Sequence, residues 1–403
     1  MFRLALRNLT RQKGRTMITL ASIVFGVAAL ILAGGFVEDI YHQLRDATIK
    51  SRLGYLQLYR AGYYEFGRRE PYDFMIEDPG AILEKVEPLP VVTEVLQRLN
   101  FTGLLNNSRT DRSVIVEGIE PDKENELASF MSVVAGRELS DDDAYAIVLG
   151  EGVATALALA PGDYVTMVAT TTSGFMNSLE FEVVGVFRSF SKDFDARAVR
   201  IPIATARELL DTTALHSLVF SLTDVTYVDP LVDWLGQHVL GDRYEVKTWL
   251  ELDDFYAKTV ALYQSQFGVL QVIILGIVLL SVANSVSMTA NERVGEFGTI
   301  RAVGHTSGYV YRLLVIENAI LGTVGAALGV AVGIGLAVLI SKVGIPMPPP
   351  PSSNAAYTAY IRVVPSVCVV AFLIGVVATV VSALLTCRQP TRTPIALALT
   401  RNI

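Results

Sequence analysis

The chain has 403 residues, of which 51% are hydrophobic and 18% charged, and its formal net charge is −7. Soluble domains usually carry about 25% charged residues, so this deficit disfavours a wholly soluble protein. The acidic balance disfavours nucleic-acid binding, which needs a basic surface.

Four uncharged apolar stretches predict four membrane-spanning helices. Each reaches or exceeds the roughly 20 residues that a helix needs to cross about 30 Å of hydrocarbon. The first stretch exceeds the apolar core of a signal peptide, so we expect it to be retained. The stretches are residues 16–37, 259–291, 318–341 and 363–386.

Basic residues predict the orientation, because Lys and Arg stay on the cytosolic side of a membrane. They gather at the N-terminus, between the second and third spans, and in the tail, which places both termini in the cytosol of a bacterium with an inner membrane. The residues are Arg3, Arg7, Arg11, Lys13, Arg15, Arg293, Arg301, Arg312, Arg388, Arg392 and Arg401. The long segment between residues 37 and 266 has 20 Lys and Arg against 37 Asp and Glu, and we expect it outside.

The predicted fold class is a membrane protein with four transmembrane α-helices and a large periplasmic α+β domain inserted between the first and second. The predicted order is a cytosolic amphipathic helix (1–15), a first span (16–37), the external domain with stalk helices (38–258), a second span (259–287), a cytosolic segment (288–312), a third span (313–341), an external loop (342–362), a fourth span (363–387) and a cytosolic tail (388–403).

Inside the external domain, short strands alternate with helices, which indicates an α+β fold of one or two lobes. Helices that continue from the first span to about residue 50, and without a break from residue 251 to about 285, would form a stalk. Strands are expected at 54–59, 95–105, 113–118, 146–150, 164–170, 179–190, 216–224 and 244–249, and helices at 151–160, 204–210 and 229–240.

The third span is rich in glycine. Small residues four apart permit close approach between helices, either within one chain or between two copies, and the sequence leaves both open. The glycines are Gly322, Gly325, Gly329, Gly333 and Gly335.

No phosphate-binding loop, metalloprotease, paired-cysteine or nucleophile-elbow motif occurs in the sequence. The four histidines lie in unlike contexts, which favours surface or core roles over metal binding. We therefore expect no catalytic residues, no metal site and no enzyme activity in this chain.

The cytosolic stretch 288–304, MTANERVGEFGTIRAVG, is short, amphipathic and charged. On a helix, Glu292 would lie one turn from Glu296, and Arg293 one turn from Phe297. Gly298 and Gly304 are expected to interrupt or end helical pieces. The stretch suits an interfacial helix against lipid headgroups or a docking surface for a cytosolic protein.

The same stretch resembles the signature ER-x-x-E-[IF]-G-x-x-[RK]-A-x-G of FtsX-type permeases. The matching residues are Glu292, Arg293, Glu296, Phe297, Gly298, Arg301, Ala302 and Gly304. The opening RNLTRQKGRTMITLASIVFGVA, the closing TRTPIALAL and the segment VVAGRELSDDDAYAIVLGEGVATALALAPGDYVTM are similar to other parts of that family.

The resemblance implies the permease subunit of an ABC transporter of the MacB/LolCDE family, most like the lipoprotein-releasing permeases. It implies a separate cytosolic ATPase that holds ATP and Mg²⁺ and contacts the 288–304 stretch, and a second copy or a sister permease. The ATPase-driven motion would pass to the external domain, while this chain itself holds no cofactor. A periplasmic chaperone or adaptor stays open, as does a contact with membrane lipid.

Two further candidates depend on this resemblance. Glu317, at the cytosolic start of the third span, either reaches outward near Arg312 or serves packing and coupling, as an acidic residue there does in the family. Phe175 and Met176 lie where lipoprotein-releasing permeases contact a chaperone, and they are either exposed at a hairpin tip or folded back onto the domain.

Three functions follow as hypotheses. The first is extraction or export of a lipoprotein, lipid or amphiphile. The alternatives are efflux of a peptide, antibiotic or toxin through an adaptor and outer-membrane duct, and non-transporting regulation of a periplasmic hydrolase.

Overall fold

The computed structural model describes residues 13–67, 69–127, 131–189, 191–348, 357–388 and 394. Most of the expected N-terminal helix 1–15 and of the tail 388–403 lies outside these residues. The chain divides into a helical unit (Met1–His42, Thr259–Pro346 and Thr358–Ile403) and an α+β unit (Gln43–Lys258 and Met347–Tyr357).

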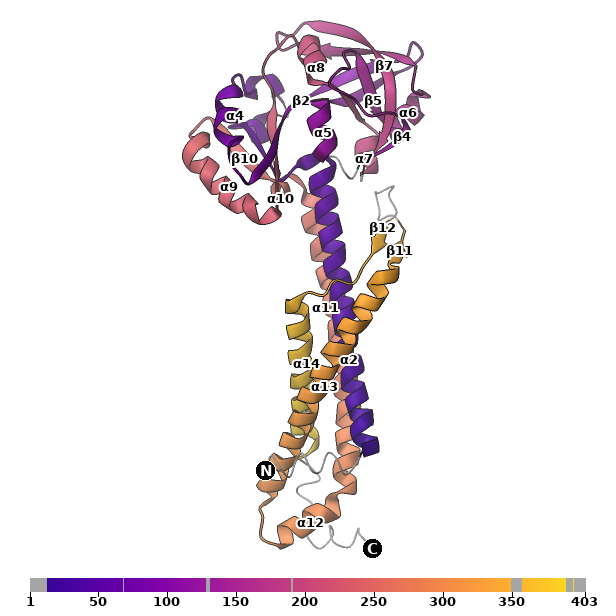
Figure 1. The fold of residues 1–403 in the computed structure, drawn as a ribbon, viewed down its shortest axis with the longest axis vertical. Coiled ribbons are helices and arrows are strands. Elements are labelled where there is room, and N and C mark those ends of the chain that lie inside the picture. The colour runs from indigo at the N-terminus through magenta and orange to yellow at the C-terminus, as the bar shows by residue number, and fades with distance from the viewer. Residues whose placement is uncertain are drawn as a thin grey trace. The chain divides into compact units, whose positions relative to one another are not determined.

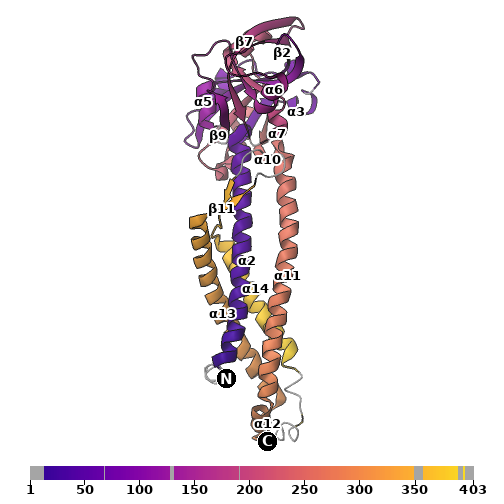
Figure 2. The same ribbon diagram turned by 90° about the vertical axis from the view of Figure 1, so that its right-hand side faces the viewer.

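Long helices make up the helical unit (Figure 2), and four of those described are long and apolar enough to cross a membrane. These four are α2 (Lys13–Thr48), α11 (Asp254–Glu292), α13 (Ser307–Val343) and α14 (Pro365–Thr386), and the short α12 (Val294–Ala302) connects α11 to α13. The strands β11 (Ile345–Met347) and β12 (Tyr357–Ala359) pair between α13 and α14. The four apolar stretches of the sequence are therefore helices, as predicted.

Glycines of α13 pack against α2 of the same chain. A Cβ added at Gly325 would lie 3.0 Å from Ile23, and one at Gly329 would lie 2.7 Å from Val27. One at Gly333 would lie 3.2 Å from the backbone of Ala28. Close approach of two helices needs such positions without side chains, so these glycines serve packing within the chain, whereas Gly335 meets nothing within 4 Å.

Ten strands of the described α+β unit form one sheet in the order β10-β1-β9-β2-β3-β8-β5-β7-β4, and β6 pairs with β2 and β7. The strands are β1 (Leu56–Arg60), β2 (Val92–Asn106), β3 (Asp111–Ile119), β4 (Ser132–Gly136), β5 (Ala146–Gly150), β6 (Tyr164–Thr170), β7 (Met176–Arg188), β8 (Ala198–Pro202), β9 (Ser217–Leu222) and β10 (Tyr244–Thr248). The predicted α+β fold is confirmed.

Short helices cover this sheet. The α-helices are α3 (Tyr63–Phe66), α4 (Gly80–Val86), α5 (Pro121–Leu127), α6 (Glu151–Leu157), α7 (Lys192–Asp195), α8 (Ile203–Leu210), α9 (Val228–Leu235) and α10 (Trp249–Leu252). The 3-10 turns are η2 (Pro71–Phe74) and η3 (Val225–Tyr227), and the π turns are η1 (Ile49–Leu53) and η4 (Gly236–Leu240).

The strand β2 divides the α+β unit into two lobes. Its residues as far as Arg98 pair with β9, and those from Leu99 onward pair with β3. The first lobe, with β1, β9, β10, α4 and α9, has a core around Leu58, Phe220 and Leu231, while the second, with β3 to β8, has one around Val116, Phe181 and Val199. The two groups of elements lie on opposite sides of β2 (Figure 1).

The expected unbroken helix from residue 251 is wrong. Thr248 caps α10, and the Glu251 carboxylate accepts hydrogen bonds from the Thr248 N–H at 2.9 Å and its hydroxyl at 3.1 Å. This capping box ends the preceding strand and starts a four-residue helix. Asp253 is then extended (φ −125°, ψ 92°), and α11 begins at Asp254.

Candidate functional site

The turn between α11 and α12 is organised by a buried arginine. Arg293 is 7% exposed as a whole residue, and its Nη1 donates to Glu317 Oε2 of α13 at 2.7 Å. Its Nε donates to Glu296 Oε2 at 2.9 Å, and its guanidinium lies 5.5 Å from the centre of the Phe297 ring. A buried charge needs such an ionic partner to offset the loss of hydration, so Arg293 joins this turn to the start of α13.

Glu317 does not reach outward toward Arg312. It is 5% exposed and faces Arg293, so the outward interpretation is wrong. A carboxylate among apolar helices is costly unless a cation faces it, and Arg293, 24 residues earlier, supplies that cation.

The residues of the signature segment separate into inner and outer groups. Phe297 is 2% exposed and Gly298 is buried inside α12, so the expected interruption at Gly298 is wrong. The helical break lies at Arg293 instead (φ −93°, ψ 9°), so Glu292 ends one helix while Glu296 belongs to the next. They do not share a helix face as expected.

The outer group lies at the two ends of α12. Glu292 and Gly304 are exposed, and Val303, between Arg301 and the glycine, is 78% exposed. Gly304 has a φ of +109°, a conformation that favours glycine, and it ends the turn that leads into α13. The outer group, Glu292, Val303 and Gly304, presents an exposed surface. The inner group, Arg293, Phe297 and Gly298, is buried and sets the shape of that surface.

The helical unit also contains a cavity of about 320 Å³ between α2, α11 and α14. Most of its lining is apolar, and most of its polar side chains, other than Gln271, belong to residues near the end where α14 begins. The polar lining residues are Glu38, Tyr41, Gln264, Gln271 and Ser366; the apolar ones include Leu30, Val37, Phe267, Val370 and Ile374. This combination suits an apolar chain with a polar end.

The cavity occupies only one half of these helices. In the other half, the Ser281 hydroxyl donates to Ser22 at 3.0 Å, Thr19 contacts Ser285, and the Ser382 hydroxyl donates to the Leu279 carbonyl at 3.0 Å. Hydrogen bonds between serine or threonine side chains and a neighbouring helix hold membrane helices together. The helices are therefore joined at one end and leave space at the other.

A buried carboxylate fixes the segment before α14 beside this cavity. Asp39 of α2 accepts hydrogen bonds from the Tyr360 N–H at 2.8 Å and from Arg362 Nε at 3.1 Å. The Arg362 N–H donates to the Gly35 carbonyl at 3.1 Å, and a Cβ at Gly35 would lie 2.4 Å from the Arg362 carbonyl oxygen. The segment thus lies directly on the α2 backbone.

Phe175 and Met176 are 74% and 79% exposed, which contradicts the folded-back interpretation. They follow the turn between β6 and β7, in which Gly174 has a φ of +86°. The base of this hairpin is fixed because the Asn177 side-chain amide donates to the Leu209 carbonyl at 3.0 Å. The two apolar side chains therefore project from a supported loop.

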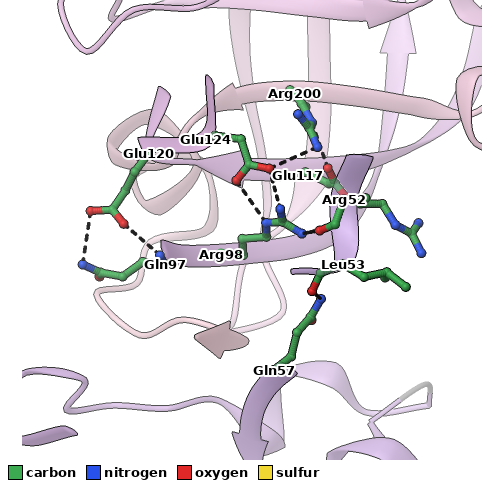
Figure 3. Close-up of polar contacts among 9 residues, drawn as sticks. All are labelled: Arg52, Leu53, Gln57, Gln97, Arg98, Glu117, Glu120, Glu124 and Arg200. Carbon is green, nitrogen blue, oxygen red and sulfur yellow. Dashed lines mark hydrogen bonds and ion pairs between the residues drawn. The ribbon is translucent and has the colours of Figure 1, made fainter. Parts of the chain in front are cut away.

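The sequence did not reveal a cluster of buried charges in the α+β unit (Figure 3). Two arginines and two glutamates are each at most 5% exposed: Arg98, Glu117, Glu124 and Arg200. The one available signal was a charged residue flanked by apolar residues in a strand, as with Glu117 and Arg200. The described residues contain no group of three His, Cys, Asp or Glu suited to a metal ion.

Comparisons with known proteins agree with this arrangement. Residues 16–237 match the family model of the MacB-like periplasmic core domain, and residues 268–395 match that of the FtsX-like permease C-terminal domain. The chain is 24% identical over 341 residues to "Lipoprotein-releasing system transmembrane protein LolC" of Neisseria meningitidis, covering 81% of this chain and 78% of that protein.

Two further relatives show the range of the likeness. The chain is 22% identical to "Uncharacterized ABC transporter permease MJ1507" of Methanocaldococcus jannaschii, covering 93% of this chain and 92% of that protein. It is 24% identical to "Macrolide export ATP-binding/permease protein MacB" of an Azoarcus species, covering 86% of this chain but 53% of that relative. These similarities extend through both the α+β unit and the helical unit.

Proposed function

Because the chain belongs to the FtsX-type ABC transporter permeases of the MacB/LolCDE family, we propose that it extracts or exports a lipid-anchored protein, a lipid or another amphiphile. In this proposal ATP is hydrolysed by a separate cytosolic subunit. The resulting motion passes through the helical unit to the α+β unit, which lies outside the membrane.

The observation that carries the choice of cargo is the cavity between α2, α11 and α14. It is apolar along most of its wall and has Glu38, Tyr41 and Gln264 toward one end. An acyl chain can pass from the lipid to such an apolar wall at little cost, because both surroundings are hydrocarbon, while its polar end would lie near the polar residues. The similarity to a lipoprotein-releasing permease supports the same class of cargo.

Two glycines of α11 provide a matched test of this cargo. A Cβ added at Gly268, which lines the cavity, meets nothing within 4 Å, and the same holds for Gly276, which does not line it. Gly268→Phe therefore fills the cavity without a backbone clash, and Gly276→Phe adds the same group elsewhere on α11.

The probe is a synthetic triacylated lipopeptide, added to the purified chain in nanodiscs and measured by native mass spectrometry. We expect Gly268→Phe to lower lipopeptide occupancy at least fivefold and Gly276→Phe to leave it unchanged. Equal occupancy in both variants would contradict the proposal. Binding of a macrolide in place of the lipopeptide would favour the efflux alternative, and copurification of a peptidoglycan hydrolase with no bound lipid would favour the regulatory one.

The contact with the ATPase is proposed at the outer group of the signature segment, around Glu292, Val303 and Gly304. Arg293 is unsuited to a docking test, because its substitution would also break the buried pair with Glu317. Val303 is 78% exposed, and Val343, at the far end of α13, is 86% exposed and serves as its control.

We expect Val303→Asp to lower the amount of copurifying ATPase at least fivefold, because it places a charge in the proposed contact. Val343→Asp should leave that amount unchanged. The ATPase is measured by quantitative mass spectrometry after affinity purification of the full chain. Unchanged recovery with Val303→Asp would place the contact elsewhere.

A further inference from the structure

The turn η1, which follows α2, meets the junction of the two lobes at one arginine. Arg98 lies on β2 where the strand changes partner from β9 to β3. Its Nη1 donates to the carbonyl of Arg52, in the π turn η1 that follows α2. Its guanidinium also binds the Glu124 carboxylate, with an Nε–Oε2 distance of 3.2 Å (Figure 3).

The second lobe holds Glu124 in place through another arginine. Arg200 Nε donates to Glu117 Oε2 at 2.9 Å, and its Nη2 lies 3.3 Å from Glu124 Oε1. Burial opposes ionisation of Glu117, yet the guanidiniums of Arg200 and Arg98 hold its pKa below the ordinary range. The two positive and two negative side chains balance, which a buried cluster requires.

The Arg52 side chain makes a second connection to that lobe. Its guanidinium carbon lies 4.8 Å from the centre of the Phe194 ring of α7. A guanidinium at this distance from an aromatic face is attracted to it. The turn η1 therefore reaches the second lobe directly through the Arg52 side chain and indirectly through its carbonyl, which binds Arg98 and so Glu124.

The return connection contacts the first lobe. The Trp249 N–H of α10 donates to the Tyr55 carbonyl at 3.1 Å, and Trp249 is buried in the core of that lobe. Asp253, between α10 and α11, accepts a hydrogen bond from the Thr48 hydroxyl at 3.4 Å. The two connections are thus attached differently, since η1 contacts both lobes, with Ile49 in the core of the first and Arg52 against Phe194 of the second, whereas α10 packs in the first.

We propose that Arg98 and Arg52 are positioning residues that set the angle between the two lobes according to the position of the turn η1. A displacement of η1 pulls on Arg98 and Phe194, and so moves the second lobe about the point where β2 changes partner. The role of this angle in transport rests on the proposed function, but the angle itself is measurable without cargo or ATPase.

The test uses spin labels on the full chain in nanodiscs, with Cys368→Ala and Cys387→Ala to remove the native thiols. Glu84→Cys on α4 and Ala156→Cys on α6 are exposed and report the distance between the lobes. Glu84→Cys with Asp229→Cys on α9 reports a distance within the first lobe.

Arg98→Met combined with Glu124→Leu removes one positive and one negative charge and leaves the Arg200–Glu117 pair. We expect the distribution of the inter-lobe distance to become at least twice as wide, while the distance within the first lobe stays unchanged. A merely structural role would alter both distances or neither. Arg98→Lys, which keeps the charge but lacks the planar fork, should give an intermediate width.

The control is Arg188→Met combined with Glu151→Leu. This pair, 2.7 Å apart, joins β7 to α6 within the second lobe. It should leave the inter-lobe distribution unchanged. An inter-lobe width in the Arg98 and Glu124 variant equal to that of the parent would overturn the inference, whatever the outcome of the lipopeptide measurement.

Discussion

Arg293, in the turn between α11 and α12, forms a buried ion pair with Glu317 of α13, and this burial determines what the loss of either charge costs. Replacing one partner leaves the other charge buried and costs about 3–5 kcal/mol, whereas replacing both by apolar residues is often neutral. The side chains are 8% and 6% exposed, so this argument applies to them directly.

We therefore expect Arg293→Met to lower the apparent melting temperature of the detergent-solubilised chain, with a loss of about 3 kcal/mol or more. Arg293→Met combined with Glu317→Leu should recover most of it. The measurement is thermal unfolding followed by size-exclusion chromatography with fluorescence detection. Additive losses in the double variant would mean that the two side chains act independently.

His216 makes the stability of the α+β unit depend on pH. Burial lowers its pKa from 6.5 to about 4, opposed by the Pro71 carbonyl 3.2 Å from Nε2. Nδ1 accepts a hydrogen bond from the Asn100 N–H, so the native ring is neutral with its proton on Nε2. Between pH 6.5 and about pH 4, the unfolded chain therefore binds up to one proton more than the folded chain does.

The free energy of unfolding that depends on a neutral His216 is fully present above pH 6.5. It falls as the pH drops toward about 4, by up to about 3 kcal/mol. His216→Asn should unfold at a lower temperature at pH 7, yet lose less stability between pH 7 and pH 4.5 than the parent. The measurement is the apparent melting temperature of the solubilised chain at each pH. Parallel pH profiles for the two proteins would contradict it.

The candidate site could be predicted in part from these residues. The signature and its charged members are visible in the sequence because they lie within one short segment. Their contacts are not, because Glu317 lies 24 residues from Arg293, and Arg200 lies 83 residues from Glu117. A lone charge in an apolar run shows that a partner is needed but does not identify it.

At the scale of elements, the packing of α13 on α2 gives a direct test. Gly329→Leu places a side chain where a Cβ would already lie 2.7 Å from Val27, so we expect a loss of about 1–3 kcal/mol from overpacking. Gly335→Leu, at a position that meets nothing within 4 Å, should have little effect. The apparent melting temperatures in detergent compare the two, and equal losses would rule out this packing role.

Most elements could be predicted because their patterns are long and local. The apolar spans and the strands β2, β3, β6 and β7 were expected close to their observed positions. The short strand β8 was missed because Arg200 and Pro202 lie within its five residues, whereas the equally short and buried β5 is an unbroken apolar run and was expected. The break at Asp253 was missed because it comes from the capping box of α10 rather than from a glycine or proline.

At the scale of the whole molecule, the distribution of basic residues predicts that the α+β unit lies outside the membrane and the segment around α12 in the cytosol. In a chain with Cys368→Ala and Cys387→Ala, we expect Phe175→Cys to react with a membrane-impermeant maleimide in intact spheroplasts. Val303→Cys should react only after permeabilisation. Both positions are exposed, so accessibility within the chain does not limit the reaction. Labelling of Val303→Cys in intact spheroplasts would reverse the proposed topology.

The break at Asp253 has a mechanical consequence for the two connections between the units. α2 continues into η1 without leaving helical geometry, and a helix whose turns are hydrogen-bonded resists twisting. α10 and α11 are separated by one extended residue, Asp253, whose N–H donates to the Trp249 carbonyl at 3.2 Å and whose carboxylate accepts from Thr48 at 3.4 Å. Such a corner interrupts the helical hydrogen bonds and ties the start of α11 to the last residue of α2. The two connections are therefore linked where they enter the α+β unit, α2 as a continuous helix and α11 through that corner.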